Sequence, residues 1–482
     1  MGLQAQTAVE SAGYESLRPG LSLFDSITIV AGSMIGSGIF IVSADIARQV
    51  GSPAALLAVW IVSGLMTMAG ALAYGELAAM MPRVGGQYVY LREAYGDLLG
   101  FLFGWTVLLV VQTGTVAAVA VAFGRFAGVL VPALNSEIWL GVGTVGFSGE
   151  RIAAIAVIAT LTAANLRGLE MGKLVQNVFT SAKVMSLLFI VVMGCVIVPN
   201  HAAIAANFSS AFFSARPMSL GFLSAFGAAM VGGLFSADAW ASVTFAGSEV
   251  KNPHRDLPLS LAIGTGGVIL LYVLTNVAYL CEIPAAGTAD GVSVFARGIA
   301  HATSDRVAAA AMEMVWHHAG AWITAILVMI STFGCANGLI LTGSRVLFAM
   351  ARDGMFFAAA GTLNRARVPA VALVIQGFWA CVLAVSGSYS ELLDYVVFAQ
   401  LIFYVLTVAA VFVMRATHPN APRPYRAFGY PYVPLAYIVA AIAIMLDLLI
   451  VKPRYSWFGL LIVVSGLPAY MMLKRTRVDD SP

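Results

Sequence analysis

The stretch IVAGSMIGSGIFIV, Ile29 to Val42, lies inside a run without charged residues that extends from Ser26 to Ala44. This run has the length and apolar character of a membrane-spanning helix. Yet three glycines and two serines fall within seven residues at its centre, and glycine weakens a helix. Backbone groups that leave a helix in hydrocarbon find no water, so such a break survives only where it lines a cavity. The stretch therefore predicts a discontinuous first helix with a binding site at the break.

The composition places the whole chain in a membrane. Of its 482 residues, 60% are hydrophobic and 10% are charged, and the mean hydropathy is +0.90. A water-soluble globule of this size does not need so apolar a sequence. Apolar runs that can cross hydrocarbon as helices recur along the chain, and they predict an all-α polytopic membrane protein with twelve transmembrane helices. These runs fall at 22–48, 54–75, 98–124, 150–166, 174–198, 217–237, 259–281, 319–344, 368–390, 395–414, 427–446 and 455–473.

The distribution of Lys and Arg predicts the orientation in the membrane. If the N-terminus is cytoplasmic, most of the 26 Lys and Arg residues fall in cytoplasmic segments, and basic loops stay on that side. We therefore expect both termini in the cytoplasm. The same asymmetry accounts for the net charge of +3, so the charge gives no reason to expect a nucleic-acid partner.

The cysteines and histidines predict neither a disulfide framework nor a metal site. The adjacent His317 and His318 point to different faces of any helix, and no Cys or His pair has the spacing of zinc ligands. No metal or cofactor is expected. The four cysteines, which all fall in or at the ends of apolar spans, are Cys195, Cys281, Cys335 and Cys381.

A second interrupted span strengthens the interpretation of the first. On its own, GSMIG at residues 32–36 also fits a small-residue packing motif between helices. VGGLFSADAWASVTF at residues 231–245 repeats the pattern, with two glycines, a serine and an aspartate inside an apolar segment. Interrupted helices at corresponding positions of two halves of a chain are typical of a transporter with a site at the membrane midplane.

The first break offers groups for both charges of a zwitterion. Gly36, Ser37 and Gly38 free N–H groups at the positive end of the outer half-helix, which suits an anion. Carbonyls from Gly32 to Met34 end the inner half-helix and suit a cation. A free amino acid presents both groups.

These and other motifs resemble one known family. GSMIGSGIF at residues 32–40 resembles the first-helix signature of the amino acid–polyamine–organocation superfamily. ALAYGELAAMMPRVGGQYVYLREAYG (71–96), LVQNVFTSAKVMSLL (174–188) and TFGCANGLILTGSRVLFAMARDG (332–354) narrow the resemblance to the L-type amino acid transporter branch. The similarity extends from about residue 22 to residue 440. It implies the LeuT-type fold, a 5+5 inverted repeat of helices with helices 1 and 6 discontinuous and two further helices.

The resemblance also implies a division of the chain and the residues of the site. We expect a cytoplasmic N-terminal segment (1–21), a first repeat (22–198), an outer loop (199–219), a second repeat (220–414), helices 11 and 12 with the preceding loop (415–473), and a cytoplasmic tail (474–482). In this family, backbone N–H groups of the first break bind the substrate carboxylate and carbonyls of both breaks bind its ammonium. The substrate-binding residues so implied are Met34, Gly36, Ser37, Gly38, Phe235, Ser236, Ala237 and Asp238.

Five side chains are candidates for coupling, gating or specificity. Lys183 lies inside span five, where a lysine costs about 2.5 to 3.5 kcal/mol; it could snorkel to the interface. The resemblance implies that its ammonium replaces a sodium ion beside the broken first helix, which predicts sodium independence. Asp238 could attract a cationic substrate side chain or stabilise the broken backbone. The rings of Phe235 and Trp240 match gate positions or simply pack, and Asn337 matches a polar position that faces the central cavity.

The remaining motifs are expected to be structural. Glu76 and Glu249 should pair with cytoplasmic arginines. PRVGGQYVYLREAYG (82–96) should form a turn and a short lateral helix on the cytoplasmic face, and AAAAMEMVWHH (308–318) should form a helix over the outer vestibule. GVGTVG (141–146) matches a dinucleotide-binding fingerprint, but we expect no strand before it and treat it as chance.

The sequence therefore predicts a sodium-independent secondary transporter of L-amino acids, most simply an exchanger that works by alternating access in the plasma membrane. A proton-coupled symporter and an exchanger of cationic amino acids or amines remain alternatives. A membrane enzyme or channel is disfavoured, because the chain lacks HExxH and GxSxG motifs and a continuous polar pore. The loop at 131–150 lacks the cysteine through which animal relatives bind an ancillary subunit, which indicates a prokaryotic inner-membrane protein without a disulfide-linked partner. The expected partners are amino acids and membrane lipid.

Overall fold

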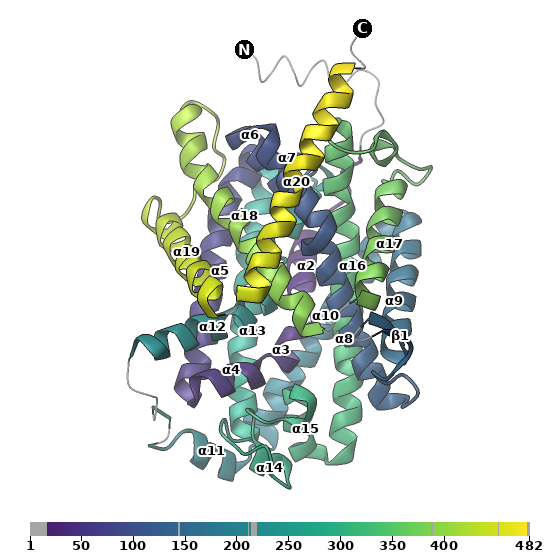
Figure 1. Cartoon of the computed structure of the whole chain (residues 1–482). Coiled ribbons are helices and arrows are strands. Elements are labelled where there is room, and N and C mark those ends of the chain that lie inside the picture. Colours follow the sequence, from purple (N-terminus) through teal and green to yellow (C-terminus); the bar gives the residue numbers. More distant parts are fainter. Residues whose placement is uncertain are drawn as a thin grey trace.

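The computed structural model describes residues 17–142, 145–210, 212–213, 219–386, 389–451 and 453–479. These residues form a bundle of helices with one short β-hairpin (Figure 1). The first half of the chain contains α2 (Leu23–Met34), α3 (Gly38–Ile41), α4 (Ser43–Val50), α5 (Pro53–Met80), α6 (Gln87–Tyr95), α7 (Asp97–Thr106), the π-helical η1 (Val107–Val111), α8 (Gln112–Leu130), β1 (Ile138–Val142), β2 (Val145–Ser148), α9 (Gly149–Leu166), α10 (Leu169–Val192), the π-helical η2 (Met193–Ile197) and α11 (His201–Asn207).

The second half is almost entirely helical. It contains α12 (Leu220–Ser236), the 3₁₀ segments η3 (Trp240–Phe245) and η4 (Gly247–Glu249), α13 (Pro253–Glu282), α14 (Val294–Arg297), η5 (Thr303–Asp305), α15 (Val307–Trp316), α16 (His318–Arg352), η6 (Ala358–Gly361), α17 (Ala370–Ser386), α18 (Tyr389–Thr417), α19 (Tyr432–Val451) and α20 (Pro453–Asp479).

Apolar helices long enough to span a membrane dominate the described part of the chain. Ten segments meet this condition, and α12 and α17 are apolar helices of 17 residues each. The prediction of an all-α polytopic membrane protein is confirmed. The domain boundaries stay predictions, and residues 1–16 of the predicted N-terminal segment lie outside the described residues.

Helix starts follow local sequence signals. Ser22 caps α2 in a capping box with Asp25, and Ser52 precedes Pro53 at the start of α5. Ser148 and Ser219 cap α9 and α12 through their side chains. These caps satisfy amide N–H groups that otherwise have no partner at a helix start.

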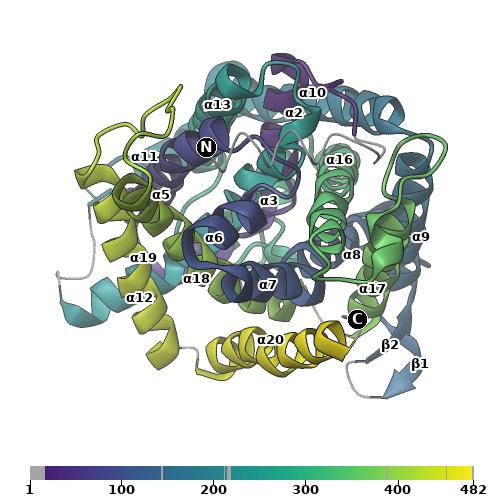
Figure 2. The ribbon, with the colours of Figure 1, turned by 90° about the horizontal axis from the view of Figure 1, so that it is seen from above.

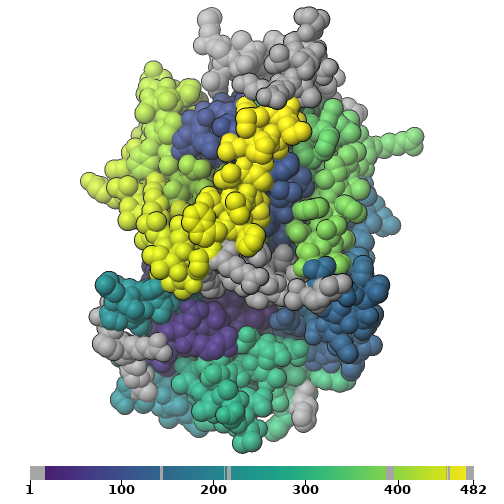
Figure 3. All heavy atoms as spheres, viewed as in Figure 1, coloured from purple at the N-terminus to yellow at the C-terminus, as the bar shows by residue number. Residues whose placement is uncertain are grey.

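The ends of the bundle differ in what covers them. The lateral helix α6 lies at the end where α20 finishes, whereas α11, α14 and α15 lie at the opposite end (Figure 1). Seen from above, α19 and α20 lie on the periphery while α2 and α3 lie inside (Figure 2). The space-filling view shows α20 along this outer face (Figure 3), and only 17% of its apolar window is buried. This exposure suits a helix that faces lipid.

The end that carries α6 is closed by backbone pairs between distant segments. Leu21 forms a parallel bridge with Val250, and Val84 forms an antiparallel bridge with Ala246. The Gly85 N–H donates to the Phe245 carbonyl at 2.9 Å. The short lateral helix predicted within 82–96 is confirmed as α6, and it lies beside these pairs.

The loop between α8 and α9 corrects one expectation. Residues 138–142 form a strand and pair with β2 in an antiparallel hairpin, so a strand does precede the GVGTVG motif. The hairpin forms because small and β-branched residues allow close pairing: a Cβ atom at Gly141 would lie 2.6 Å from the Gly146 Cα. The strand leads into another strand rather than a helix, so the glycines still do not form a dinucleotide site.

Candidate functional site

The first interruption follows α2, which ends at Met34. Ile35 has φ −74° and ψ 87°, which are not helical values, and the Gly36 N–H turns back to the Met34 carbonyl at 2.8 Å. Helix resumes at Gly38, where the first N–H groups of α3 have no carbonyl partner within their own helix. The chain is thus non-helical for three residues at the depth where sequence predicted a break.

The second interruption follows α12, which continues through Ser236. The Ala237 N–H still bonds to the Gly233 carbonyl at 3.0 Å, and Asp238 and Ala239 then leave the helix. Ala239 has φ 66°, a left-handed conformation that costs a non-glycine residue about 1 to 3 kcal/mol. The irregular residues are therefore 237–239, slightly later than the glycines suggested.

The two interruptions touch each other. A Cβ atom at Gly38 would lie 2.2 Å from Ser236 Oγ and 3.0 Å from Ser236 Cα, so only glycine fits there. Tyr272 of α13 joins both segments, because its hydroxyl lies 3.0 Å from the Met34 carbonyl and 3.0 Å from the Ser236 carbonyl. The hydroxyl has one proton, so it can donate to only one of these carbonyls at a time.

A cavity lies at this junction. It has an empty volume of about 280 Å³ and a mixed polar and apolar wall. Within the described residues, the buried Ser33 Oγ in this wall has no hydrogen-bond partner, which indicates room for a polar ligand. Of the predicted binding residues, Ala237 is buried but does not line this cavity. The lining residues are Ser33, Met34, Gly36, Ser37, Gly38, Thr115, Val119, Phe235, Ser236, Asp238, Ala239 and Cys335.

Lys183 lies beside the interruption between α2 and α3 and does not line the cavity. Its side chain is fully buried, and Nζ donates to the Gly32 carbonyl at 2.7 Å and to the Ile35 carbonyl at 2.8 Å. The side chain therefore does not snorkel to the interface. Gly334 of α16 makes room for it, because a Cβ atom there would lie 3.4 Å from Nζ. A tethered cation thus pairs with carbonyls at the end of the inner half-helix.

Residues of α16 complete the bonding at the break. Ser331 Oγ lies 3.1 Å from the Ile35 carbonyl and 3.0 Å from the Gly36 carbonyl, and Cys335 Sγ donates to the Ser33 carbonyl at 3.0 Å. Sequence reasoning missed Ser331, Cys335 and Tyr272. Their only signal is polarity inside apolar spans, which many packing residues share.

Asp238 borders two further cavities on the other side of the second break. One has an empty volume of about 340 Å³ and the other about 300 Å³. Tyr404 donates its hydroxyl proton to Asp238 Oδ1 at 2.6 Å. Gln400 lines both cavities, and its buried Oε1 has no hydrogen-bond partner among the described residues. Asp238 and Gln400 Oε1 are thus acceptors in the walls of these cavities.

Two predicted gate or cavity residues lie elsewhere. Trp240 stacks on Tyr404 with ring centroids 5.0 Å apart and lines the cavity of about 340 Å³. Asn337 is fully buried between helices, where its Nδ2 donates to the Gly172 carbonyl and to Gln176 Oε1, each at 3.0 Å. Asn337 lines none of the three cavities.

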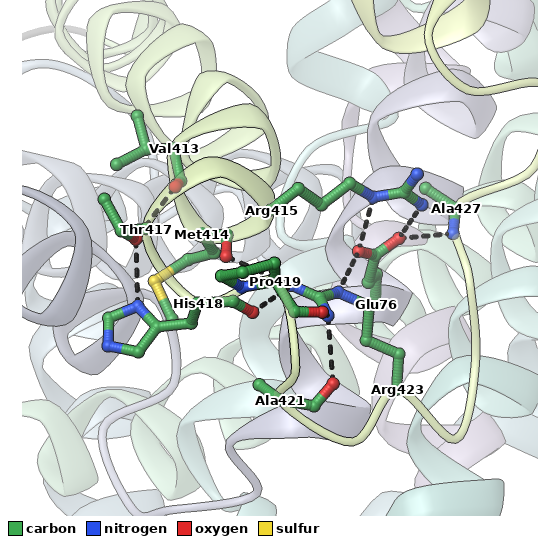
Figure 4. A network of polar contacts seen from close by, with 10 residues as sticks. All are labelled: Glu76, Val413, Met414, Arg415, Thr417, His418, Pro419, Ala421, Arg423 and Ala427. Carbon is green, nitrogen blue, oxygen red and sulfur yellow. Dashed lines mark hydrogen bonds and ion pairs between the residues drawn. The ribbon is translucent and has the colours of Figure 1, made fainter.

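The acidic residues predicted to be structural do pair with arginines. Glu76 accepts from Arg415 at 2.9 and 2.6 Å and from the Ala427 N–H at 2.7 Å, with Arg423 at 3.3 Å (Figure 4). Glu249 accepts from Arg345 at 2.8 and 3.1 Å, and both side chains are buried. Both pairs lie toward the end of the bundle that carries α6, away from the cavity.

No cluster of three metal-ligating side chains occurs within the described ranges.

The helix α15 contacts α3 from the opposite end of the bundle, and residues 307–312 of α15 are buried. The predicted helix at 308–318 is confirmed as α15 up to Trp316.

Comparison with known proteins identifies relatives over nearly the whole chain. The model of the amino acid permease family matches residues 21–467. The chain is 30% identical over 460 residues to the human b(0,+)-type amino acid transporter 1, covering 95% of this chain and 88% of the relative. It is 29% identical over 466 residues to the rabbit large neutral amino acids transporter small subunit 2, covering 96% and 82%.

Proposed function

Because the chain belongs to the amino acid permease family, in its L-type amino acid transporter branch, we propose that it is a sodium-independent exchanger of L-amino acids. Amino acid transport is the activity of the family, and the chain is a multi-pass membrane protein. Exchange, sodium independence and the substrate pose are the proposal. The observation that carries it is the meeting of two non-helical segments at one polar cavity.

The cavity offers a complementary pose for a zwitterion. The substrate carboxylate binds the N–H groups of Gly36, Ser37 and Gly38 at the positive start of α3. The ammonium binds the carbonyls of Met34 and Ser236. Tyr272 donates to only one of these carbonyls at a time, and each carbonyl oxygen has two lone pairs, so both can accept from the substrate. Phe235 and Asp238 border the space left for the side chain.

Sodium independence rests on Lys183. Its ammonium already donates hydrogen bonds to the Gly32 and Ile35 carbonyls at the end of the inner half-helix. A bound sodium ion would serve the same carbonyls, so the tethered cation leaves no need for it. The lysine is fixed in the protein, which suits exchange of one substrate for another rather than uptake driven by an ion gradient.

Exchange of cationic amino acids or amines is a second candidate. It is favoured by the acceptor groups around Asp238, including the unpaired Gln400 Oε1. A cationic or donor-rich side chain would find partners there. The neutral alternative uses the same cavities for apolar side chains.

The proposed location is a prokaryotic inner membrane with both termini in the cytoplasm. Support comes from the placement of Arg415 and Arg423 toward the end of the bundle where α20 finishes. The loop at 131–150 contains no cysteine, so we propose that the protein works without a disulfide-linked subunit.

Counterflow in proteoliposomes tests the function. Purified protein is reconstituted in vesicles preloaded with one amino acid, and uptake of a radiolabelled amino acid is measured with and without sodium and a pH gradient. If the protein is an exchanger, uptake requires internal substrate and is the same with and without sodium. Uptake into empty vesicles that follows a pH gradient would instead support a proton symporter. Uptake without stimulation by internal substrate, or chemical change of the amino acid, would exclude the proposal.

A further inference from the structure

Two cysteines lie against each other at the end of the bundle that carries α11, α14 and α15. Cys195 belongs to η2, which continues α10, and Cys281 is the second-last residue of α13. Their thiols interact with each other, and both side chains are half-buried. The two helices therefore bring a pair of reduced thiols into contact where part of each side chain remains accessible.

The surrounding backbone keeps these thiols adjacent. A Cβ atom at Gly194 would lie 3.3 Å from the Ala278 carbonyl oxygen, so glycine allows η2 to approach α13 closely. The Asn200 N–H donates to the Cys281 carbonyl at 3.1 Å, and its side chain donates to the Glu282 carbonyl at 3.1 Å. The pairing thus belongs to the folded structure rather than to a loose surface contact.

A buried carboxyl group completes the cluster. Glu282 is 1% exposed, and its Oε1 has no hydrogen-bond partner among the described residues. It interacts electrostatically with both Cys195 and Cys281.

We propose that Cys195 and Cys281 are a reversible disulfide-forming pair that locks α10 to α13 and slows transport in an oxidising outer medium. The oxidant is a disulfide compound, R–S–S–R. The Cys195 thiolate attacks one of its sulfurs, which forms a mixed disulfide and releases RS⁻; the Cys281 thiol then loses its proton, attacks the Cys195 sulfur and releases the second RS⁻. The protein loses two electrons, and R–S–S–R takes up these electrons and the two thiol protons to leave as two RSH.

The lock reaches the cavity through the same two helices. Cys195 lies about 18 Å along the helix from Lys183, and Cys281 lies about 14 Å from Tyr272, at 1.5 Å per residue. Lys183 and Tyr272 both hold the end of α2. Alternating access requires rearrangement around the broken helices, so a covalent link between the helices that carry these two groups opposes it.

The side of the membrane favours oxidation. The thiol pair lies at the end of the bundle opposite to the end of α20, because α13 leads from it to α14 and α15 (Figure 1). Under the proposed orientation this is the outer side. Disulfides persist outside the cytoplasm and are rare within it.

The test uses the full chain in proteoliposomes treated with oxidised glutathione or with dithiothreitol. Peptide mass spectrometry looks for a Cys195–Cys281 link, and exchange of a radiolabelled amino acid is measured on the same vesicles. Hydrogen–deuterium exchange of residues 193–200 and 276–283 reports the lock independently of transport. Cys195→Ser and Cys281→Ser remove the pair, and Cys381→Ser is the matched control because Cys381 is also a half-buried thiol.

We expect the link in the wild type and in Cys381→Ser after oxidation, with exchange lowered about fivefold or more and restored by dithiothreitol. Neither single variant of the pair should respond. Absence of the linked peptide overturns the pairing, and a link that changes neither transport nor hydrogen exchange overturns the lock. The transport readout rests on the proposed function. If the reduced protein exchanges nothing, that function fails, while the linked peptide and the hydrogen exchange still decide this inference.

Discussion

At the scale of single residues, side chains from other helices replace the bonds that α2 gives up. Carbonyls at its end receive donors from α10, α13 and α16. Lys183 could be predicted because a charge inside an apolar span stands out. Tyr272 could not, because a tyrosine in an apolar run is common and only the fold decides where its hydroxyl points.

Replacing Lys183 tests the tethered cation. In Lys183→Ala the carbonyls of Gly32 and Ile35 lose the Lys183 ammonium as a donor, and a hydrogen bond to a charged group contributes about 1.5 to 3 kcal/mol. We expect exchange to fall by about tenfold or more, measured as counterflow in proteoliposomes. Lys173→Ala is the control, since Lys173 lies on the same helix but pairs with the exposed Glu170. Equal loss in both variants would contradict the role of Lys183.

The contact between the two breaks makes a steric prediction. A methyl group at Gly38 would lie 3.0 Å from Ser236 Cα, so Gly38→Ala must push the two broken segments apart. We expect exchange to be lost while the protein remains folded in detergent. Gly267→Ala is the matched control, because a Cβ atom at Gly267 meets nothing within 4 Å. Normal exchange by Gly38→Ala would show that the breaks need not touch.

At the scale of elements, glycines predicted the first break well and the second less well. Gly232 and Gly233 lie inside regular α12, and the chain leaves the helix only after Ser236. The reason is packing, since a Cβ atom at Gly232 would lie 2.2 Å from Val42 Cγ1. Gly232 therefore lets α12 approach Val42, and Gly233 lets it approach Ser63 of α5, where a Cβ atom would lie 2.7 Å from Ser63 Oγ. Ser236 and Asp238, the polar part of the same sequence signal, lie closer to the turn, where Ala239 has a positive φ.

The loop between α18 and α19 is fastened to α5 by one carboxylate. Glu76 is 1% exposed and faces Arg415 and Arg423 (Figure 4). In Glu76→Gln two arginines lose their counter-charge, and breaking a buried pair costs about 3 to 5 kcal/mol; partial exposure of Arg415 places the effect at the low end. We expect a clearly lower melting temperature in detergent.

The control for this network is an acidic residue in an exposed pair. Glu93→Gln removes a partner of Arg83, whose side chain is 39% exposed, and should leave the melting temperature nearly unchanged. A melting temperature for Glu76→Gln that equals the wild-type value would mean that the loop is held by its other contacts alone, such as the packing of Arg415 on Tyr430.

At the scale of the whole molecule, hydropathy predicted the fold because the membrane leaves few choices. Backbone groups in hydrocarbon must be satisfied inside each helix, so span lengths translate directly into elements. The hairpin of β1 and β2 escaped prediction because it lies between spans, where that constraint is absent. Which residues meet at the cavity likewise depends on how helices pack, as the burial of Asn337 away from it shows.

The orientation of the bundle gives the last prediction. Val292 is 99% exposed in the segment before α14, and Phe357 is 72% exposed in the segment after α16, so the two mark opposite ends. In a chain without its native cysteines, a membrane-impermeant maleimide added to right-side-out vesicles should label Val292→Cys and spare Phe357→Cys. The arginines near the end that carries α6 require this result, because basic segments stay in the cytoplasm. The reverse labelling pattern would show that the protein has the opposite orientation, which places the thiol pair of Cys195 and Cys281 on the reducing cytoplasmic side.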